Sequence, residues 1–278
     1  IGRSAFYNCS SLTGITIPES VTTIGNYAFD GCSSLTSVTI PDSVTFIDGS
    51  VFSGCRDMAT LKLSNSITRI SSYTFIGCDS LVSVEIPDSV TSIGSVAFSG
   101  CTGLTTITIP SSVTTIGNSA FYSCDSLTSV TIPDSVTSIG DSAFSGCTNL
   151  VNVEFNATDV MGSSTFQNCS SLPSITLKNV TYLYDSNFQN CSSLTTADFG
   201  SSLTYMRYEN FRDSGLKTLI LRSNRVVGII SANNFRGSPF AIDGTGGTLY
   251  VPQSMIASYQ ADSNWSTLLG YANNQILP

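Results

Sequence analysis

The chain has 278 residues, of which 41% are hydrophobic and 11% charged, so charge-driven disorder is excluded and a packed core is expected. Its net charge of −8 argues against a nucleic-acid binder, and no apolar run of about 18 residues, the length that membrane insertion needs, occurs. Histidine is absent, which excludes Ser-His-Asp and Cys-His catalysis and histidine-ligated metals.

Cysteine and phenylalanine recur with a fixed period from the start of the chain. The first seven of the nine cysteines are 23 residues apart, and the last two gaps are 22 residues. Each cysteine follows a phenylalanine by three residues, and the phenylalanine column continues at Phe211 and Phe235 after the cysteines end. Such a period is typical of a solenoid, in which each repeat buries its apolar face against its neighbours. We therefore predict about eleven coils of 22–24 residues.

The unit over 126–147 reads SLTSVTIPDSVTSIGDSAFSGC and shows what one coil contains. Its L-x-x-V-x-I part alternates with a period of two, which predicts a short strand that ends before Pro133. The V-x-x-I-G part is either a second, weaker extended segment or a turn. Ala143 and Phe144 predict a short helical or 3₁₀ turn that places the ring in the middle of the coil. The repeat solenoid is thus expected to be mainly β.

These motifs resemble those of a known family. The L-x-x-[IV]-x-[IV] spacing is similar to leucine-rich repeats, and I-G-x-x-A-F-x-x-C resembles the BspA-like class found in bacterial and some protist surface proteins. The resemblance runs from Ile1 to about Arg236 and implies a right-handed solenoid with a parallel sheet on its concave face. We expect this solenoid over 1–240, beginning within a repeat because Ile1 matches the isoleucine of I-G-x-x-A-F.

The segment 241–278 departs from the repeat and is predicted to cap the solenoid. The run 249–251 predicts a last strand, and a short helix with Tyr259 and a segment with Trp265, the single tryptophan, follow it. The segment looks like the array ends of BspA-like proteins. A cap covers the core cross-section that a repeat array would otherwise expose.

The nine cysteines lie in phase with the phenylalanines, which predicts buried free thiols. None has the C-x-x-C spacing of a zinc site, and no histidine is present to activate a thiol, so neither a metal nor a cofactor is expected. Acidic residues follow the first strand in four units, where they are better explained as turn formers beside proline than as cation ligands: Glu19, Asp42, Asp88 and Asp134.

The outward positions of the first strand are the residues one, two and four places after the leucine. Of thirty such positions, eighteen are Thr or Ser. Either threonine simply fits an exposed strand, or the hydroxyls form a regular array such as ice-binding surfaces use. Charged residues interrupt the array and count against ice binding. They are candidate ligand contacts on the concave face: Lys62, Glu85, Glu154, Asp198 and Lys217.

A second candidate surface lies on the opposite side, around the spine isoleucine of the second segment. In the later units its residues are Tyr182, Tyr184, Tyr205, Arg207 and Tyr208. Stacking of adjacent coils is expected to bring these five together, and the same outward column is expected to continue at Ile229. Tyr and Arg are enriched in binding hot spots. The five are therefore either a ligand-binding patch or local packing that compensates for missing glycine and proline.

The resemblance implies a non-enzymatic protein-binding or adhesion function, with the protein extracellular or at a cell surface. Expected partners are proteins of a host cell, its matrix or a neighbouring microbe, with fibronectin or fibrinogen as candidates. We expect a monomer. Two alternatives stay open: a structural spacer or stalk on the cell surface, and recognition of carbohydrate or cell wall through the tyrosines.

Overall fold

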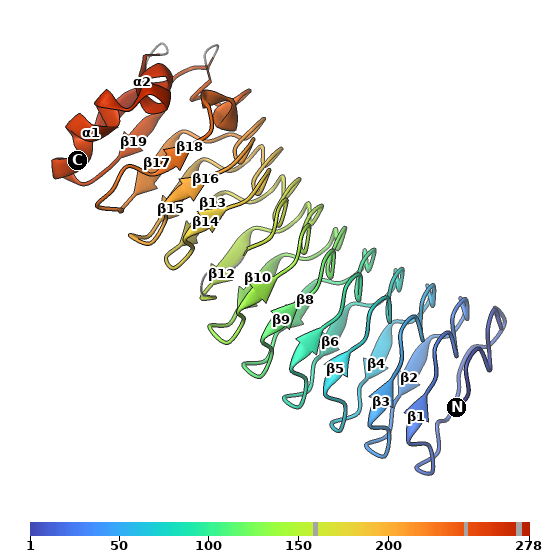
Figure 1. Ribbon diagram of the computed structural model, residues 1–278. Helices are drawn as coiled ribbons and strands as arrows, with labels where there is room; N and C mark the ends of the chain where they lie inside the picture. Colours follow the sequence, from blue (N-terminus) through green and yellow to red (C-terminus); the bar gives the residue numbers. More distant parts are fainter. Residues whose placement is uncertain (158–160, 242–243, 271–273) are drawn as a thin grey trace.

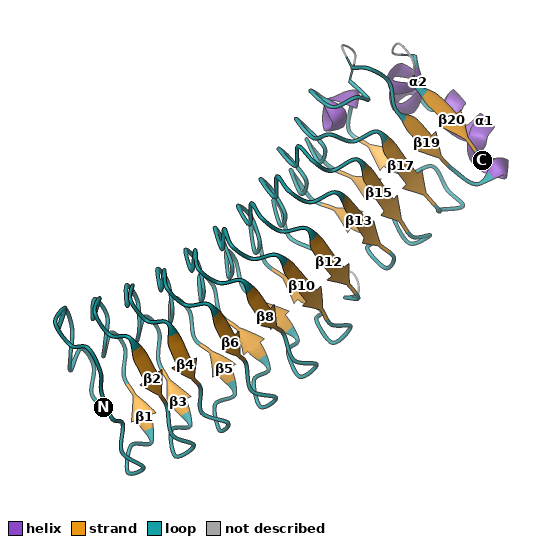
Figure 2. Ribbon diagram, turned by 180° about the vertical axis from the view of Figure 1, so that it is seen from behind, coloured by secondary structure: helices purple, strands orange, loops and turns teal. Residues whose placement is uncertain are grey.

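The computed structural model describes residues 1–157, 161–241, 244–270 and 274–278. The chain forms a long solenoid in which each coil stacks on the one before it, so the two termini lie at opposite ends (Figure 1). Two rows of parallel strands run along it, and the helices lie at its C-terminal end (Figure 2). The predicted mainly β repeat solenoid is confirmed.

The first strand row contains the L-x-x-V-x-I segments, paired in parallel within three sheets. These sheets are β2 (Ser37–Thr39) with β4 (Thr60–Lys62); β6 (Ser83–Glu85), β8 (Thr106–Thr108), β10 (Ser129–Ile132) and β12 (Asn152–Phe155); and β13 (Ser174–Leu177), β15 (Thr196–Phe199), β17 (Thr218–Leu221), β19 (Thr248–Tyr250) and β20 (Gln275–Leu277). The third sheet shows that pairing continues beyond the repeats.

The second strand row contains the V-x-x-I-G segments, which form strands of two residues rather than turns. They are β1 (Thr23–Ile24), β3 (Phe46–Ile47), β5 (Arg69–Ile70), β7 (Ser92–Ile93), β9 (Thr115–Ile116), β11 (Ser138–Ile139), β14 (Tyr182–Leu183), β16 (Tyr205–Met206) and β18 (Gly228–Ile229). In each of them the second residue is buried, so the first faces outward.

Alternation along the strands of the first row separates core from solvent, as the sequence predicts. In β8, Ile107 is buried between exposed Thr106 and Thr108. The threonine before the strand has a further role, because Thr105 Oγ1 donates to the carbonyl of Val82 in the preceding coil at 3.2 Å. The same bond recurs at Thr36, Thr91, Thr114, Thr128, Thr137, Thr195 and Thr204. These hydroxyls add bonds between coils, and four of them belong to outward positions of the first row: Thr36, Thr105, Thr128 and Thr195.

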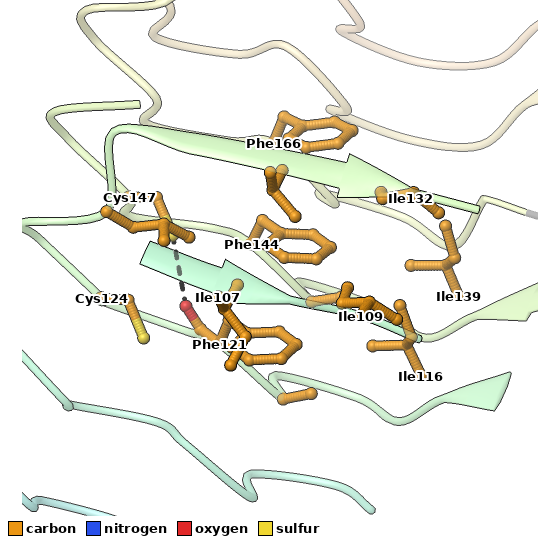
Figure 3. Packing of buried hydrophobic residues seen from close by; sticks show 14 of the residues in the cluster. Ile107, Ile109, Ile116, Phe121, Cys124, Ile132, Ile139, Phe144, Cys147 and Phe166 are labelled. Carbon is orange, nitrogen blue, oxygen red and sulfur yellow. Dashed lines mark hydrogen bonds between the residues drawn. The ribbon is translucent and has the colours of Figure 1, made fainter. Parts of the chain in front are cut away.

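The phenylalanine column forms the spine of the core. The rings of Phe98 and Phe121 stack with centroids 5.3 Å apart, and similar pairs, at 5.0–6.0 Å, continue from Phe6 to Phe235. Each buried cysteine bonds the phenylalanine carbonyl of the preceding coil; Cys147 Sγ lies 3.3 Å from the carbonyl oxygen of Phe121 (Figure 3). The cysteines are therefore hydrogen-bond donors as well as small core residues.

The expectation of buried free thiols is wrong for one cysteine. The nine thiols are free and eight are buried, but Cys9 is exposed. Cys9 lies in the outermost coil, which packs against a neighbour on one side. A cysteine thiol is therefore buried where a coil packs on each side of its own coil.

The turn that carries the phenylalanine is not helical in the middle of the solenoid, contrary to the prediction. The N–H groups of Val96, Phe98 and Gly100 each donate to a carbonyl of the next coil at 2.8 Å. A helix would need such donors for its own backbone bonds. The turn instead contains two left-handed residues, Val96 (φ 60°) and Gly100 (φ 71°). A 3₁₀ helix, η1 (Ala232–Phe235), replaces this turn in the last coil.

Two short helices and a final strand follow the last coil. After η2 (Gln253–Met255), α1 (Ile256–Ala261) and α2 (Ser263–Leu269) lie over the end of the core, where Trp265 contacts Phe235 with ring centroids 6.1 Å apart. The strand predicted over 249–251 is β19, but β20 ends the sheet by pairing with β19 in parallel. Three residues are too few to show a period, so the sequence did not reveal β20. The boundary at 240 stays a prediction.

Candidate ligand-binding surface

The five tyrosine and arginine residues singled out in the sequence come together on the second strand row of the late coils, which carry β13 to β18. Tyr182 of β14 lies opposite Tyr205 of β16, and their rings stack with centroids 5.5 Å apart. Tyr184 is tilted against Tyr182 at 4.8 Å. We call Tyr182, Tyr184, Tyr205, Arg207 and Tyr208 the aromatic cluster.

Arg207 connects the cluster to a carboxylate and to a further ring. Its Nε lies 3.3 Å from Asp185 Oδ1, and its guanidinium carbon lies 5.7 Å from the centroid of the Tyr208 ring. Tyr184 and Tyr208 are 40% and 48% exposed. Partial burial raises the pKa of Tyr182. The cluster therefore offers a ligand phenol hydroxyls, ring faces and a guanidinium.

Two buried asparagines hold the backbone beneath the cluster, and sequence reasoning missed them. Asn187 Nδ2 donates to the carbonyl of Tyr184 at 3.2 Å, and Asn210 Nδ2 donates to the carbonyl of Arg207 at 3.3 Å. Asn210 Oδ1 also accepts the N–H of Asn187 at 3.2 Å, which ties the two coils together. The signal was present in the sequence, because N-F replaces A-F before the spine phenylalanine in these coils.

The outward column continues at Gly228, so the expectation of Ile229 was wrong by one residue. β16 pairs with β18 so that Tyr205 lies opposite Gly228 and Met206 opposite Ile229, which is buried. The ring of Tyr205 lies over Gly228, where a Cβ would overlap it. The register was misassigned because two isoleucines, Ile229 and Ile230, follow the glycine and either one fits the spine pattern.

Gly228→Ala is expected to displace the Tyr205 ring and disrupt its stacking on Tyr182, because the added Cβ has no room. Because Tyr205 is only half-buried, its ring can move toward solvent, and the substitution should cost less stability than the roughly 1–3 kcal/mol of overpacking in a core. Nuclear Overhauser contacts between the two rings measure the stacking, and they should weaken or vanish. Gly14→Ala is the control, since a Cβ there meets nothing within 4 Å. Unchanged ring contacts in Gly228→Ala would contradict the placement of Tyr205.

The charged positions of the first strand row do not form a single site. Lys62 ends β4 and Glu85 ends β6, and both border a hollow of about 320 Å³ that Asn65 also lines. Glu154 lies farther along, in β12, where its Oε2 accepts a bond from Thr131 Oγ1 at 3.3 Å. Only Lys62 and Glu85 of the five therefore share a hollow within the described residues.

The other two charged positions lie in the late coils. Asp198 of β15 is held by Arg222 through two bonds of 2.9 and 2.7 Å, so its carboxylate is already paired. Lys217 directly precedes β17 and is exposed. These positions are separated from the Lys62 hollow by the length of the middle coils, and they cannot contact the same small ligand.

One of the acidic residues beside the prolines, Asp42, bonds the corresponding loop of the next coil. Asp42 Oδ1 accepts the N–H of Asn65 at 2.8 Å and its Oδ2 accepts from Asn65 Nδ2 at 3.3 Å, which lowers the pKa of Asp42. Over 1–157, 161–241, 244–270 and 274–278, no three Asp, Glu, Cys or His side chains gather in a way that could hold a metal ion.

Coils of 22–24 residues, with their leucine and phenylalanine columns stacked into one core, define a leucine-rich repeat protein. The family model of the BspA type leucine rich repeat region matches residues 1–128 and 114–240 in six copies. The chain belongs to the BspA-type leucine-rich repeat family, as its motifs predicted. Comparison with curated proteins finds no match. Among the described residues no helix has the length and apolarity needed to cross a membrane.

Solved bacterial structures share this fold. A leucine-rich repeat protein of T. pallidum is 33% identical, with a TM-score of 0.56 over 58% of this chain and 78% of that one. A leucine-rich cell surface protein of Faecalibacterium prausnitzii is 27% identical, with a TM-score of 0.55 over 85% of this chain and 80% of that one. The pneumococcal vaccine antigen PcpA, at 18% identity and a TM-score of 0.57 over 93% of this chain and 71% of that one, is similar in fold.

Proposed function

We propose that this chain is a non-enzymatic module of a cell-surface protein and that it binds a protein ligand through the aromatic cluster. The stack of half-buried Tyr182 and Tyr205, with exposed Tyr184 beside it, carries the proposal. Exposed aromatic side chains beside an arginine have the composition of protein-binding hot spots. The description of the F. prausnitzii relative as a cell surface protein supports the location. Matrix and plasma glycoproteins such as fibronectin and fibrinogen are the candidate ligands.

The exposure of the cluster favours ligand binding over local packing. A ring that only fills the space left by a missing glycine or proline gains most when it is fully buried. Tyr184 and Tyr208 instead keep 40% and 48% of their surface in solvent. In the middle coils the equivalent outward positions of the second row carry Ser92, Thr115 and Ser138. Of the described second-row strands, only β3, with Phe46, and the neighbouring β14 and β16, with Tyr182 and Tyr205, carry an aromatic side chain at this position.

The test is binding to immobilised fibronectin, fibrinogen, collagen and mucin. The cluster variant combines Tyr182→Ala, Tyr205→Ala and Arg207→Ala, and it is expected to weaken saturable binding at least about tenfold. The matched control combines Tyr73→Ala and Tyr122→Ala, two tyrosines outside the cluster that are 47% and 44% exposed. The control should bind like the wild type.

Three outcomes would overturn the proposal. Equal binding by the cluster variant and the wild type would show that the ligand binds outside the aromatic cluster. Absence of saturable binding by the folded wild type to any of the proteins would favour a spacer. Binding to free saccharides that Tyr182→Ala and Tyr205→Ala abolish, without binding to the deglycosylated proteins, would make the cluster a carbohydrate site. Circular dichroism confirms folding of each variant.

A further inference from the structure

The sign of the charge changes along the solenoid. No lysine or arginine occurs over 70–177, although this segment contains eight acidic residues. The following segment, 178–236, contains seven basic and four acidic residues. The protein is acidic as a whole, so the late coils form a local exception. A confined basic region on an acidic protein attracts anionic partners to one place.

The change is clearest in the loops that connect the two strand rows. In earlier coils these loops contain Glu19, Asp42, Asp88 and Asp134. In the late coils the corresponding loops are 178–181, 200–204 and 222–227, which we call the late loop edge. They contain three cations and no acidic residue: Lys178, Arg222 and Arg225. One edge of the solenoid thus turns from acidic to basic where the aromatic cluster begins.

Two of these cations have no ion-pair partner among the described residues. Arg222 binds Asp198, while Arg207 and Arg212 in the same coils bind Asp185, Glu209 and Asp213. Lys178 and Arg225 are exposed, and within the described part of the chain neither has a carboxylate in ion-pair range. Their charges are therefore available to a partner.

Arg225 borders a hollow of about 360 Å³, which is lined by Ser201, Thr204, Ser223, Asn224 and Arg225. Thr204 directly precedes Tyr205, so the hollow adjoins the aromatic cluster. The hydroxyls of two serines, the Asn224 amide and the Arg225 guanidinium can donate hydrogen bonds to carboxylate oxygens, whereas the Thr204 hydroxyl already donates to the carbonyl of Thr181. The size of the hollow suits one or two side chains.

The loop that carries Arg225 is braced by the C-terminal helices. Tyr259 Oη accepts the N–H of Val227 at 3.0 Å and donates to the carbonyl of Arg225 at 3.4 Å. Trp265 Nε1 donates to the carbonyl of Val227 at 2.7 Å. A loop held at both carbonyls presents Arg225 in a defined place, which lowers the entropy lost when a ligand binds.

We infer that the late loop edge binds an acidic segment of the partner protein, with carboxylates against Lys178 and Arg225 and uncharged side chains against the aromatic cluster. This inference rests on the proposed function and names the chemistry of the ligand. These two cations beside tyrosine rings suit a few carboxylates interspersed with apolar residues. A dense polyanion would need a longer row of free cations.

The probe is a fluorescent synthetic peptide that alternates glutamate with leucine, compared with a peptide in which glutamine replaces glutamate. The wild type is expected to bind the glutamate peptide saturably, and more weakly as salt rises. The double variant Lys178→Glu and Arg225→Glu is expected to lose at least about tenfold in affinity. The control, Arg3→Glu and Arg56→Glu, changes the net charge equally at exposed arginines of the first coils.

An equal loss in the control variant would overturn the inference, because the effect would then come from net charge. Equal binding of the glutamine peptide, or binding of heparin alone, would also overturn it. The fibronectin and fibrinogen measurements with the cluster variant separate the two claims. If the glycoproteins bind in a cluster-dependent way and the glutamate peptide does not bind, the proposed function is supported and the inference of an acidic ligand is wrong. If the glutamate peptide binds and the glycoproteins do not, the site for an acidic segment is supported and the glycoproteins are not its ligands.

Discussion

Phe98→Ala is expected to lower the free energy of unfolding by about 3–5 kcal/mol. Phe98 is fully buried, and its ring lies between those of Phe75 and Phe121 at centroid distances of 5.2 and 5.3 Å. Removal of the ring leaves a cavity in the middle of the column, and the coils on both sides lose their stacking partner. Urea unfolding followed by circular dichroism measures the change.

Thr108→Ala is the matched control, in the strand that follows Phe98. Thr108 is exposed on the first strand row, so its loss should cost only about 0.5 kcal/mol. A similar, small effect of both substitutions would show that inside and outside are wrongly assigned. Because repeat proteins interact mainly with nearest neighbours, the Phe98 variant is also expected to unfold in more than one step.

A rise in pH from 9 towards 12 is expected to destabilise the protein strongly. Burial raises the pKa of eight cysteine thiols from the ordinary value of 9.0, to about 12 for Cys55, Cys101, Cys147 and Cys191. Below pH 9 the thiols are protonated in both the folded and the unfolded state, and their contribution to the free energy of unfolding is fully present. Above it the unfolded chain ionises first, so stability falls until the folded thiols titrate. Each of the four thiols with a pKa of about 12 contributes about 1 kcal/mol per pH unit in this window.

Urea unfolding at a series of alkaline pH values, under reducing conditions, measures this slope. The variant with Cys101→Ala and Cys147→Ala should show a shallower slope, because it lacks two of the buried thiols. Cys9→Ala changes an exposed thiol and is the control. A slope that is identical in all three proteins would mean that other groups cause the alkaline loss of stability.

The repeated core could be predicted from sequence because a solenoid turns periodic positions into neighbours in space. The phenylalanine column, the alternating first strand and the meeting of Tyr182 with Tyr205 all follow from residues one period apart. Other features could not be predicted, because they depend on contacts between residues that do not recur at the repeat spacing. The turn before Phe98 resembles a helical pattern in composition, but its N–H groups bond the next coil.

The same limit applies to the candidate site. Sequence columns identified Arg207 as a candidate but not its ion pair with Asp185, which depends on side-chain direction. They also did not identify Arg225, whose loop is positioned by Tyr259 from a segment 32 residues after Val227. The roles of Asn187 and Asn210 were readable in principle, since a polar residue in a buried column must find partners.

The parallel pairing of successive coils has a mechanical consequence. The hydrogen bonds between coils point along the long axis, and the termini lie at opposite ends (Figure 1). Tension between the termini therefore loads one coil interface at a time, as a zipper does, instead of shearing many bonds at once. A middle coil releases 23 residues, about 80 Å of extended chain, as it detaches. Single-molecule stretching should record steps of this length, and the remaining coils would stay folded while the module lengthens under load.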